Sequence, residues 1–229
     1  GRAALLDAGI DANELNLIIV ATTTPDEHFP SVATMVQARI GMTRGAAFDL
    51  QAVCSGFIYG LAVADSLIRS GGAKTILLIG AETMSRLLDW DDRTTAVLFG
   101  DGAGAVVLQA HHGHGNNADQ GVLNTKIFSD GRLHDYLYTD GGVSLGRPGK
   151  LKMAGREVFR HAVTNIAAAI TASTEAAGIA IAEVDWFVPH QANQRILDGT
   201  AKKLGIDPAK VVSTVAAHGN TSAASVPLS

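Results

Sequence analysis

The sequence predicts an α/β fold made of two similar halves. Short apolar runs alternate with longer segments of helical periodicity, which is the pattern of strands connected by helices. Apolar residues make up 47% of the 229 residues, enough for a substantial core. A stretch near the N-terminus reappears in the second half of the chain, which indicates an internal duplication.

The first half is expected to contain four strands and two principal helices. Apolar runs predict strands over residues 17–22, 47–53, 75–80 and 103–109. A helix over residues 31–40 has Ser31 as its expected N-cap. A second, buried helix begins directly after Cys54 and ends at Gly71 and Gly72.

The second half follows a polar loop over residues 113–120 that is rich in Gly and Asn. We place the boundary between two domains, 1–118 and 119–229, in this loop. The elements expected after it are strand 121–128, helix 154–178, strand 184–188, helix 192–204, strand 210–214 and a helix from about Thr221.

The duplication is visible in a repeated motif. Ala-Gly-Ile at residues 8–10, followed by an apolar run, recurs at residues 177–179 with the same spacing. Each copy continues into a helix that ends in glycine, Gly41 in the first and Gly205 in the second. Two similar halves place matching strand ends, and hence reactive side chains, at one shared interface.

Composition narrows the classes of function. A net charge of −4 argues against nucleic acid as the main partner, and no stretch is long and apolar enough for a membrane helix. The single cysteine excludes an internal disulfide and is typical of a reducing compartment, so we expect a cytoplasmic protein. The sequence starts inside one predicted helix and stops early in another, which predicts an internal fragment of a longer protein.

Three polar residues follow predicted strands and are the candidate catalytic residues: Cys54, His190 and Asn220. A thiol at a helix N-terminus experiences the positive end of the helix dipole, so we expect a lowered pKa and a nucleophilic thiolate at Cys54. A neutral imidazole and a carboxamide both donate hydrogen bonds and together suit an enolate oxygen. The set therefore favours thioester chemistry.

Each of these residues also has a structural interpretation. A lone cysteine is often an inert core residue, a histidine after a strand is often simply hydrogen-bonded, and Asn220 suits an N-cap. Their occurrence together in a duplicated frame favours catalysis. The glycine-rich run at residues 100–104 resembles a dinucleotide loop, but it opens a predicted strand and not a helix, so we expect a tight turn with close backbone packing.

Four motifs closely resemble those of β-ketoacyl-acyl-carrier-protein synthase III. They are Phe-Asp-Leu-Gln-Ala-Val-Cys-Ser-Gly-Phe at 48–57, the segment at 92–105, Val-Pro-His-Gln-Ala-Asn at 188–193, and His-Gly-Asn-Thr-Ser-Ala-Ala-Ser at 218–225. They occur in family order and cover nearly the whole chain. The resemblance implies the thiolase fold, in which two similar α/β halves form an αβαβα layered arrangement, here expected to be truncated at both ends.

The resemblance also implies a reaction. Cys54 takes an acyl group, typically acetyl, from acyl-coenzyme A, and malonyl-acyl-carrier protein then enters. His190 and Asn220 stabilise the enolate as CO2 leaves, and the carbanion attacks the Cys54 thioester to give 3-ketoacyl-carrier protein. This is the first condensation of type II fatty acid synthesis, carried out by a homodimer without a metal or other cofactor.

Binding roles implied by the resemblance fall on two groups of residues. Those expected to bind coenzyme A or the acyl chain are Arg93 (adenine), Gly155, Phe159, Ala192 and Asn193 (pantetheine tunnel), and Phe29 (the partner's acyl pocket). Those expected to bind the acidic carrier protein are Arg160, Arg195, Lys202 and Lys203. Ordinary core packing is the competing interpretation for Phe159, and a solvated helix face is the competing interpretation for the cations.

Two other functions remain open at this point. A condensing enzyme of the same fold in polyketide or signal-molecule synthesis uses similar residues with other acyl donors or acceptors. A scaffold that binds carrier protein without activity is the non-enzymatic possibility. Acylation of Cys54 separates the enzymes from the scaffold.

Overall fold

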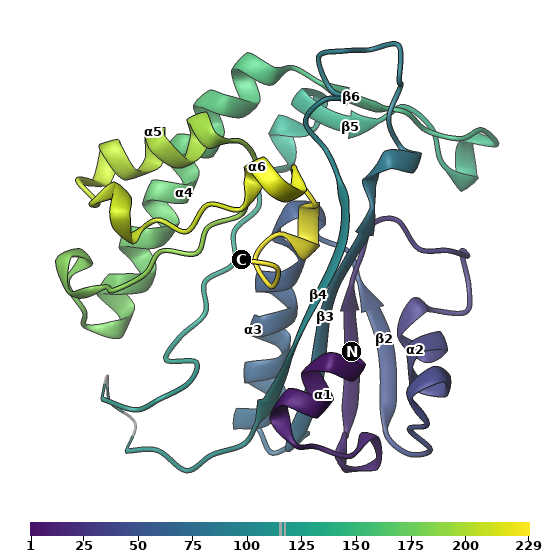
Figure 1. Ribbon diagram of the computed structural model, residues 1–229, viewed down its shortest axis with the longest axis vertical. Coiled ribbons are helices and arrows are strands. Elements are labelled where there is room, and N and C mark those ends of the chain that lie inside the picture. Colours follow the sequence, from purple (N-terminus) through teal and green to yellow (C-terminus); the bar gives the residue numbers. More distant parts are fainter. Residues whose placement is uncertain (115, 117) are drawn as a thin grey trace.

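A four-stranded sheet and a pair of long helices form the two main parts of the protein (Figure 1). The computed structural model describes residues 1–114, 116 and 118–229. Gly115 and Asn117, within the predicted boundary loop, lie outside the described residues. The α/β class expected from the alternating pattern is confirmed.

The sheet contains β1 (Leu17–Ala21), β2 (Ala46–Leu50), β3 (Thr75–Thr83) and β4 (Asp101–Gln109). Their order in space is β2-β1-β3-β4; the first three strands are parallel, and β4 runs antiparallel beside β3. All four strands predicted for the first half are therefore present. β1 is buried along its whole length, because strands and helices enclose it on every side.

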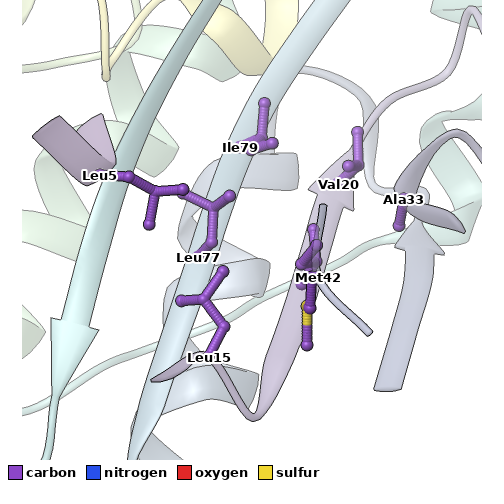
Figure 2. Packing of buried hydrophobic residues seen from close by; sticks show 8 residues of the cluster. Leu5, Leu15, Val20, Ala33, Met42, Leu77 and Ile79 are labelled. Atoms are coloured by element: carbon purple, nitrogen blue, oxygen red, sulfur yellow. The ribbon is translucent and has the colours of Figure 1, made fainter. Parts of the chain in front are cut away.

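Alternating side chains give the sheet two apolar faces. Ile18, Val20, Leu77 and Ile79 point to the face covered by α1 (Arg2–Ala8) and α2 (Val32–Ile40), as Figure 2 shows for several of them. The residues between them, including Ile19 and Leu78, point to the face covered by α3 (Gly56–Arg69). Two core layers, one on each side of the sheet, follow from this alternation.

The N-terminus of α2 is fixed to the sheet by polar contacts. The Ser31 hydroxyl accepts from the Thr34 N–H at 3.3 Å, which confirms Ser31 as the N-cap. The carboxylate of Asp49, on β2, accepts the N–H groups of Val32 and Ala33 at 2.8 Å each. A negative charge at a helix N-terminus also complements the helix dipole.

The second half is mainly helical. α4 (Gly155–Ala177) and α5 (Gln194–Leu204) pack together, and a hairpin of β5 (Leu137–Thr139) and β6 (Leu151–Met153) precedes them. Both helices end at a glycine with left-handed backbone, Gly178 and Gly205, as the sequence predicts. A short helix, α6 (Val215–His218), leads into the C-terminal turn.

Three strands predicted in the second half are not formed. Residues 184–188 and 210–214 meet only in a single parallel bridge between Phe187 and Val211, and residues 121–128 have no regular structure. The Phe187 N–H and C=O pair with Lys210 and Val212, and no further pairs extend this ladder among the described residues. The helix predicted from Thr221 is a 3-10 turn, Ser222–Ala224.

The repeated motif forms the same local structure in both places. In each copy a helix ends at a left-handed glycine, Gly9 or Gly178, with φ of 65° in both. A 3-10 turn follows, closed by a glutamate that accepts a backbone N–H three residues earlier, at 2.9 Å for Glu14 and 2.8 Å for Glu183. The repeated sequence motif therefore has the same local backbone conformation in both copies.

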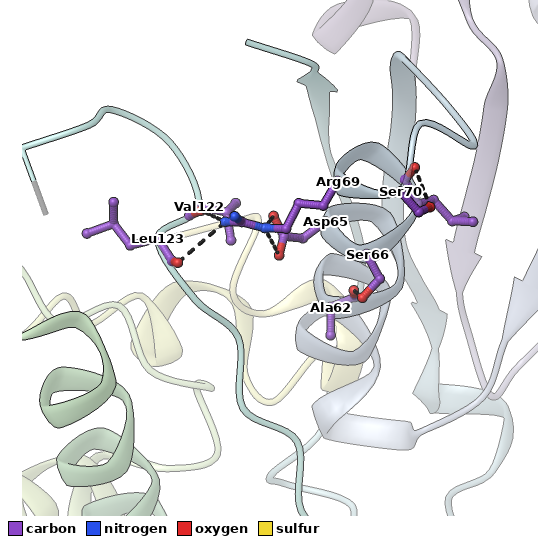
Figure 3. Close-up of polar contacts among 8 residues, drawn as sticks. Ala62, Asp65, Ser66, Arg69, Ser70, Val122 and Leu123 are labelled. Carbon is purple, nitrogen blue, oxygen red and sulfur yellow. Dashed lines mark hydrogen bonds and ion pairs between the residues drawn. The ribbon is translucent and has the colours of Figure 1, made fainter. Parts of the chain in front are cut away.

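The connection between the halves lies along α3. Figure 3 shows Arg69, on α3, between Asp65 and the carbonyl oxygens of Val122 and Leu123. The guanidinium lies 2.8 Å from the Asp65 carboxylate and donates to the two carbonyls at 2.8 and 3.4 Å. Tyr59, near the start of α3, donates to the carbonyl of Phe128 at 2.9 Å. These contacts fix the path from the sheet to the helical half.

Candidate active site

The site is built around one turn of the C-terminal segment, residues 220–225. This segment, yellow in Figure 1, lies between β3 and β4 on one side and α4 and α5 on the other. The 3-10 turn Ser222–Ala224 contacts the start of α3 and the end of β3. The turn thereby joins residues of the second half to Cys54 in the first.

Small residues at the end of the sheet make room for this turn. On the α3 face of β3 the apolar side chains of Ile76 and Leu78 are followed by Gly80. A Cβ at Gly80 would lie 2.2 Å from the carbonyl oxygen of Ala223. The same is true on β4, where a Cβ at Gly104 would lie 2.7 Å from Pro227. The close packing predicted for residues 100–104 is confirmed, but the predicted tight turn is wrong, since residues 101–104 belong to β4.

Cys54 lies in the 3-10 turn Val53–Ser55, which leads directly into α3. Cys54 is partly exposed as a residue, but its thiol is buried next to the Ser222 side chain. The residue before it, Val53, has a φ of 47°, a conformation that a β-branched residue adopts only at a cost. The turn is therefore held in a strained conformation at the nucleophile.

Burial raises the pKa of the Cys54 thiol to about 11, and the carboxylate of Glu82 raises it further, against a lowering by the Ser222 hydrogen bond. The expectation of a lowered pKa from the helix N-terminus is therefore wrong for this structure. Removing the thiol from water, beside a negative charge, outweighs the favourable end of a helix dipole. The resting side chain is a thiol, so its proton must leave before attack.

His190 is held by Ser225. Its Nδ1 lies 2.7 Å from the Ser225 hydroxyl oxygen, which also accepts the Gln191 N–H at 3.3 Å. Burial lowers the pKa of the imidazole to about 4, so His190 is neutral at physiological pH, as the sequence predicts. In the tautomer in which Ser225 donates to Nδ1, the ring proton is on Nε2 and available to a substrate.

Asn220 is fixed on both sides. Its backbone bridges to Phe99 and pairs with Leu98 and Gly100, at 2.8 and 3.0 Å. Its side-chain Oδ1 accepts the Ser222 N–H at 2.9 Å. Within residues 1–114, 116 and 118–229, no group accepts a hydrogen bond from its Nδ2. The carboxamide therefore has a donor available for a substrate oxygen.

Glu82, at the end of β3, is a residue that the sequence reasoning missed. Its side chain is 4% exposed, and Oε2 accepts from the Thr23 N–H at 3.0 Å and from the Thr24 hydroxyl at 2.6 Å. Oε1 accepts from the Ser222 hydroxyl at 3.1 Å. A charged residue that ends an otherwise apolar strand run, Ile76–Ala81 in sequence, was the signal available.

The residues expected to bind coenzyme A lie in several places. Arg93 is exposed in the turn between β3 and β4, and Phe29 is 79% exposed in the loop before α2. Gly155 is the first residue of α4, and Asn193 caps α5 by accepting the Ile196 N–H at 3.0 Å, with Ala192 directly before it. Among the described residues, no hydrogen bond or ring contact joins Arg93 or Phe29 to the turn at 220–225.

The expected carrier-protein cations differ in their surroundings. Arg160 pairs with Glu157 on the same helix at 2.8 Å. The Arg195 guanidinium lies 5.5 Å from the centre of the Phe159 ring, so one predicted docking residue contacts one predicted tunnel residue. Lys202 and Lys203 are exposed on the last turn of α5. These four cations thus lie on the surface of the α4–α5 pair.

Neither a metal-binding cluster nor a membrane-spanning helix occurs in the described part of the chain. Across those ranges, no three His, Cys, Asp or Glu side chains are grouped so as to hold a metal ion. None of the helices in the same ranges has the length and apolarity needed to cross a bilayer.

Comparison with known proteins gives concordant matches. The family model for 3-oxoacyl-[acyl-carrier-protein] synthase III matches residues 48–131, and its C-terminal model matches residues 174–229. The β-ketoacyl-[acyl-carrier-protein] synthase III of Rhodospirillum rubrum is 63% identical over 229 residues, which is 99% of this chain and 71% of that protein.

Solved structures agree. The 3-oxoacyl-[acyl-carrier-protein] synthase III of Aquifex aeolicus superimposes with a TM-score of 0.91 at 44% identity, over 99% of this chain and 70% of that one. The priming β-ketosynthase from the R1128 polyketide pathway gives 0.86 at 34% identity, over 99% and 68%. The predicted thiolase fold is confirmed by these matches, and the chain belongs to the 3-oxoacyl-[acyl-carrier-protein] synthase III family.

Proposed function

We propose that this protein is the acyltransferase that condenses acyl-coenzyme A, with acetyl as the expected acyl group, with malonyl-acyl-carrier protein to initiate type II fatty acid synthesis. One observation carries the assignment of roles. The turn at 220–225 contains Asn220, whose side chain accepts the Ser222 N–H, and it contacts the other two candidates: Cys54 through Ser222 and His190 through Ser225. A nucleophile and two neutral donors therefore share one support.

The first half-reaction is acylation of Cys54. The sulfur attacks the thioester carbonyl of acyl-coenzyme A, a new C–S bond forms, and the coenzyme A thiolate leaves and takes a proton. Exchange of one thioester for another costs little free energy, so a cysteine suits the step better than a serine. The thiol proton must be removed, since the pKa of Cys54 is raised to about 11.

The second half-reaction is decarboxylation and condensation. Malonyl-carrier protein loses CO2, and the electron pair of the breaking C–C bond develops as an enolate on the thioester oxygen. The Nε2–H of His190 and the Nδ2–H of Asn220 donate to that oxygen. The enolate carbon then attacks the acyl carbonyl on Cys54, and the cysteine leaves as 3-ketoacyl-carrier protein forms.

A neutral His190 is essential to this assignment. An imidazolium is a stronger donor but would need to be desolvated as a charge, and burial opposes that, as the lowered pKa of about 4 reflects. The neutral ring donates without that cost. Ser225 supports the required tautomer by holding Nδ1 at 2.7 Å.

The binding residues are proposed from their positions. Arg93 stacks on adenine, and Gly155, Phe159, Ala192 and Asn193 line the pantetheine path at the starts of α4 and α5. Phe29, with its side chain 79% exposed, reaches a second copy of the chain in a homodimer. Arg160, Arg195, Lys202 and Lys203 receive the acidic carrier protein.

We also infer that the two halves, 1–118 and 119–229, descend from one duplicated unit and that the protein is cytoplasmic. The matched glycine caps at Gly9 and Gly178 support the first inference. A single, unpaired cysteine in a site that needs a free thiol supports the second, because a reducing compartment preserves it.

A second candidate is a priming ketosynthase of polyketide synthesis. The similarity to the R1128 enzyme, which is 34% identical, is the observation that favours it. The 63% identity to the R. rubrum enzyme favours fatty acid synthesis. Rates with a series of acyl-coenzyme A donors and with carrier proteins of both pathways distinguish the two.

The deciding experiment is mass spectrometry of the protein after exposure to acetyl-coenzyme A. We expect one acetyl adduct, on the peptide that contains Cys54, and none in Cys54→Ser. A Cys54 peptide that carries no acetyl group in the wild-type protein contradicts the proposal. A protein that binds carrier protein yet never becomes acetylated is the scaffold, not the enzyme.

A further inference from the structure

A buried carboxylate, that of Glu82, lies near the Cys54 thiol, with the Ser222 hydroxyl between them. Glu82 lies at the end of β3, and the Ser222 side chain lies between it and the thiol. Ser222 is fully buried and has a φ of 49°, so its position is held despite backbone strain. Strain of this kind is expected where a side chain must be placed for function.

The two oxygens of Glu82 have different surroundings. Oε2 accepts the Thr23 N–H and the Thr24 hydroxyl, with the Thr22 hydroxyl at 3.4 Å, and these contacts fix the carboxylate to the end of β1. Oε1 accepts only the Ser222 hydroxyl among the described contacts. The free capacity of the carboxylate is thus directed towards Ser222, and through it towards Cys54.

We propose that Glu82 receives the Cys54 proton through the Ser222 hydroxyl when the thiol attacks, and returns it when the cysteine leaves. This inference rests on the proposed nucleophilic role of Cys54. As acylation begins, the S–H proton moves to Ser222 Oγ while the Ser222 proton moves to Glu82 Oε1. The products are a thiolate that accepts from Ser222 and a neutral Glu82.

The proton count balances over the cycle. When the condensed product leaves, the Cys54 thiolate regains its proton from Ser222, and Ser222 regains one from Glu82. The departing coenzyme A thiolate takes its proton from water, which is the one proton that the whole reaction consumes. Cys54 and Glu82 together carry one negative charge before acylation and after product release, and none in the acyl-enzyme.

The transfer answers the electrostatic problem of this site. Losing the thiol proton to water would leave two negative charges side by side in a buried place, which is costly. Passing the proton to Glu82 exchanges one charge for another. His190 is the other titratable group attached to the turn, through Ser225, and it is neutral.

The test is the pH dependence of alkylation by iodoacetamide, a neutral reagent. Cys54 is the only cysteine, so the measured rate belongs to it alone. In the wild-type protein we expect the alkylation rate to stop falling as pH is lowered to neutral, since the transfer of the proton to Glu82 needs no hydroxide. In Glu82→Gln we expect a tenfold fall for each pH unit below the thiol pKa, and a loss of about 100-fold at pH 7.

Two further variants separate transfer from folding. Ser222→Gly removes the hydroxyl at a φ that glycine adopts readily, and we expect it to behave like Glu82→Gln. Asp49→Asn neutralises a carboxylate of the same sheet that binds α2, and we expect the wild-type pH profile. Circular dichroism confirms that each variant is folded.

Contrary outcomes are distinct. Faster alkylation of Glu82→Gln at pH 7 overturns the proposal, because the carboxylate then only raises the thiol pKa. Equal acetylation rates in Glu82→Gln and wild type overturn it too, while Cys54 remains the nucleophile. A wild-type protein that acetyl-coenzyme A never acetylates refutes the proposed function itself.

Discussion

Residues 17–21 and 184–188 are the apolar runs that close the two copies of the repeated sequence pattern, but they adopt different structures. The first is β1, paired on both sides along its whole length. The second makes a single bridge, at Phe187, and Trp186 beside it is 65% exposed. Helix, glycine cap and 3-10 turn are the same in both. Local sequence therefore specifies local geometry, whereas a strand also requires neighbours to pair with.

In the proposed function, acylation belongs to a residue of the first half and decarboxylation to residues of the second, and variants should separate the two steps. We expect His190→Ala and Asn220→Ala to lower CO2 release from malonyl-carrier protein by about 100- to 1000-fold, since each removes one enolate donor. Acetylation of Cys54 should persist in both. The matched control is Cys54→Ser, which should lose acylation and retain decarboxylation. Undiminished CO2 release in both donor variants would remove their assigned role.

The contact between the halves depends on Gly80. Gly80→Ala places a Cβ that must displace the Ala223 carbonyl, 2.2 Å away in the present geometry. We expect a loss of about 3 kcal/mol in the free energy of unfolding, together with altered alkylation of Cys54. Gly131→Ala is the control, because no atom lies within 4 Å of its added Cβ. Urea unfolding of both variants measures the difference; equal stabilities would mean that the turn moves aside freely.

One buried leucine should contribute more to the free energy of unfolding in the core of the sheet than in the core beside α5. Leu78, on β3, is completely buried within the sheet, whereas Leu197, on α5, borders a small apolar cavity with Phe187 and Ile206. We expect Leu78→Ala to cost about 4 kcal/mol and Leu197→Ala about 2.5 kcal/mol, because the second site is already less tightly packed. Urea unfolding tests the order, and a larger cost at Leu197 would reverse the comparison.

The two halves should also lose stability at opposite ends of the pH scale. The pKa of Cys54 is about 11 in the folded protein and near 9 in the unfolded chain. The unfolded chain therefore loses the thiol proton first, and stability falls as pH rises from 9 to 11. His190 in the folded protein takes a proton only near pH 4, so stability falls as pH drops from 6.5 to 4.

Each of these effects is about 3 kcal/mol. Melting temperatures against pH should show the alkaline loss reduced in Cys54→Ala and the acid loss reduced in His190→Gln. A variant whose pH curve parallels the wild type would show that its residue does not titrate differently on folding.

The candidate catalytic residues could be proposed from the sequence because short motifs and strand ends locate them. Glycine caps and helix ends at Gly41, Gly178 and Gly205 were predictable for the same local reason. The missing strand at 121–128 was not, since pairing is decided by segments distant in sequence. Neither was the raised pKa of Cys54, which depends on burial and on Glu82, a residue brought near only by the fold.

The C-terminal turn at 220–225, which packs against Gly80, is synthesised after the rest of the site. A ribosome releases β1 to β4 and Cys54 well before residues 220–225 exist, and N-terminal parts of a chain generally fold first. At that stage no Ser222 connects the thiol to Glu82, and neither enolate donor is present. If Glu82 receives the Cys54 proton, reactivity towards cellular thioesters depends on a segment made much later, and we expect the nascent chain to escape acylation until that segment is in place.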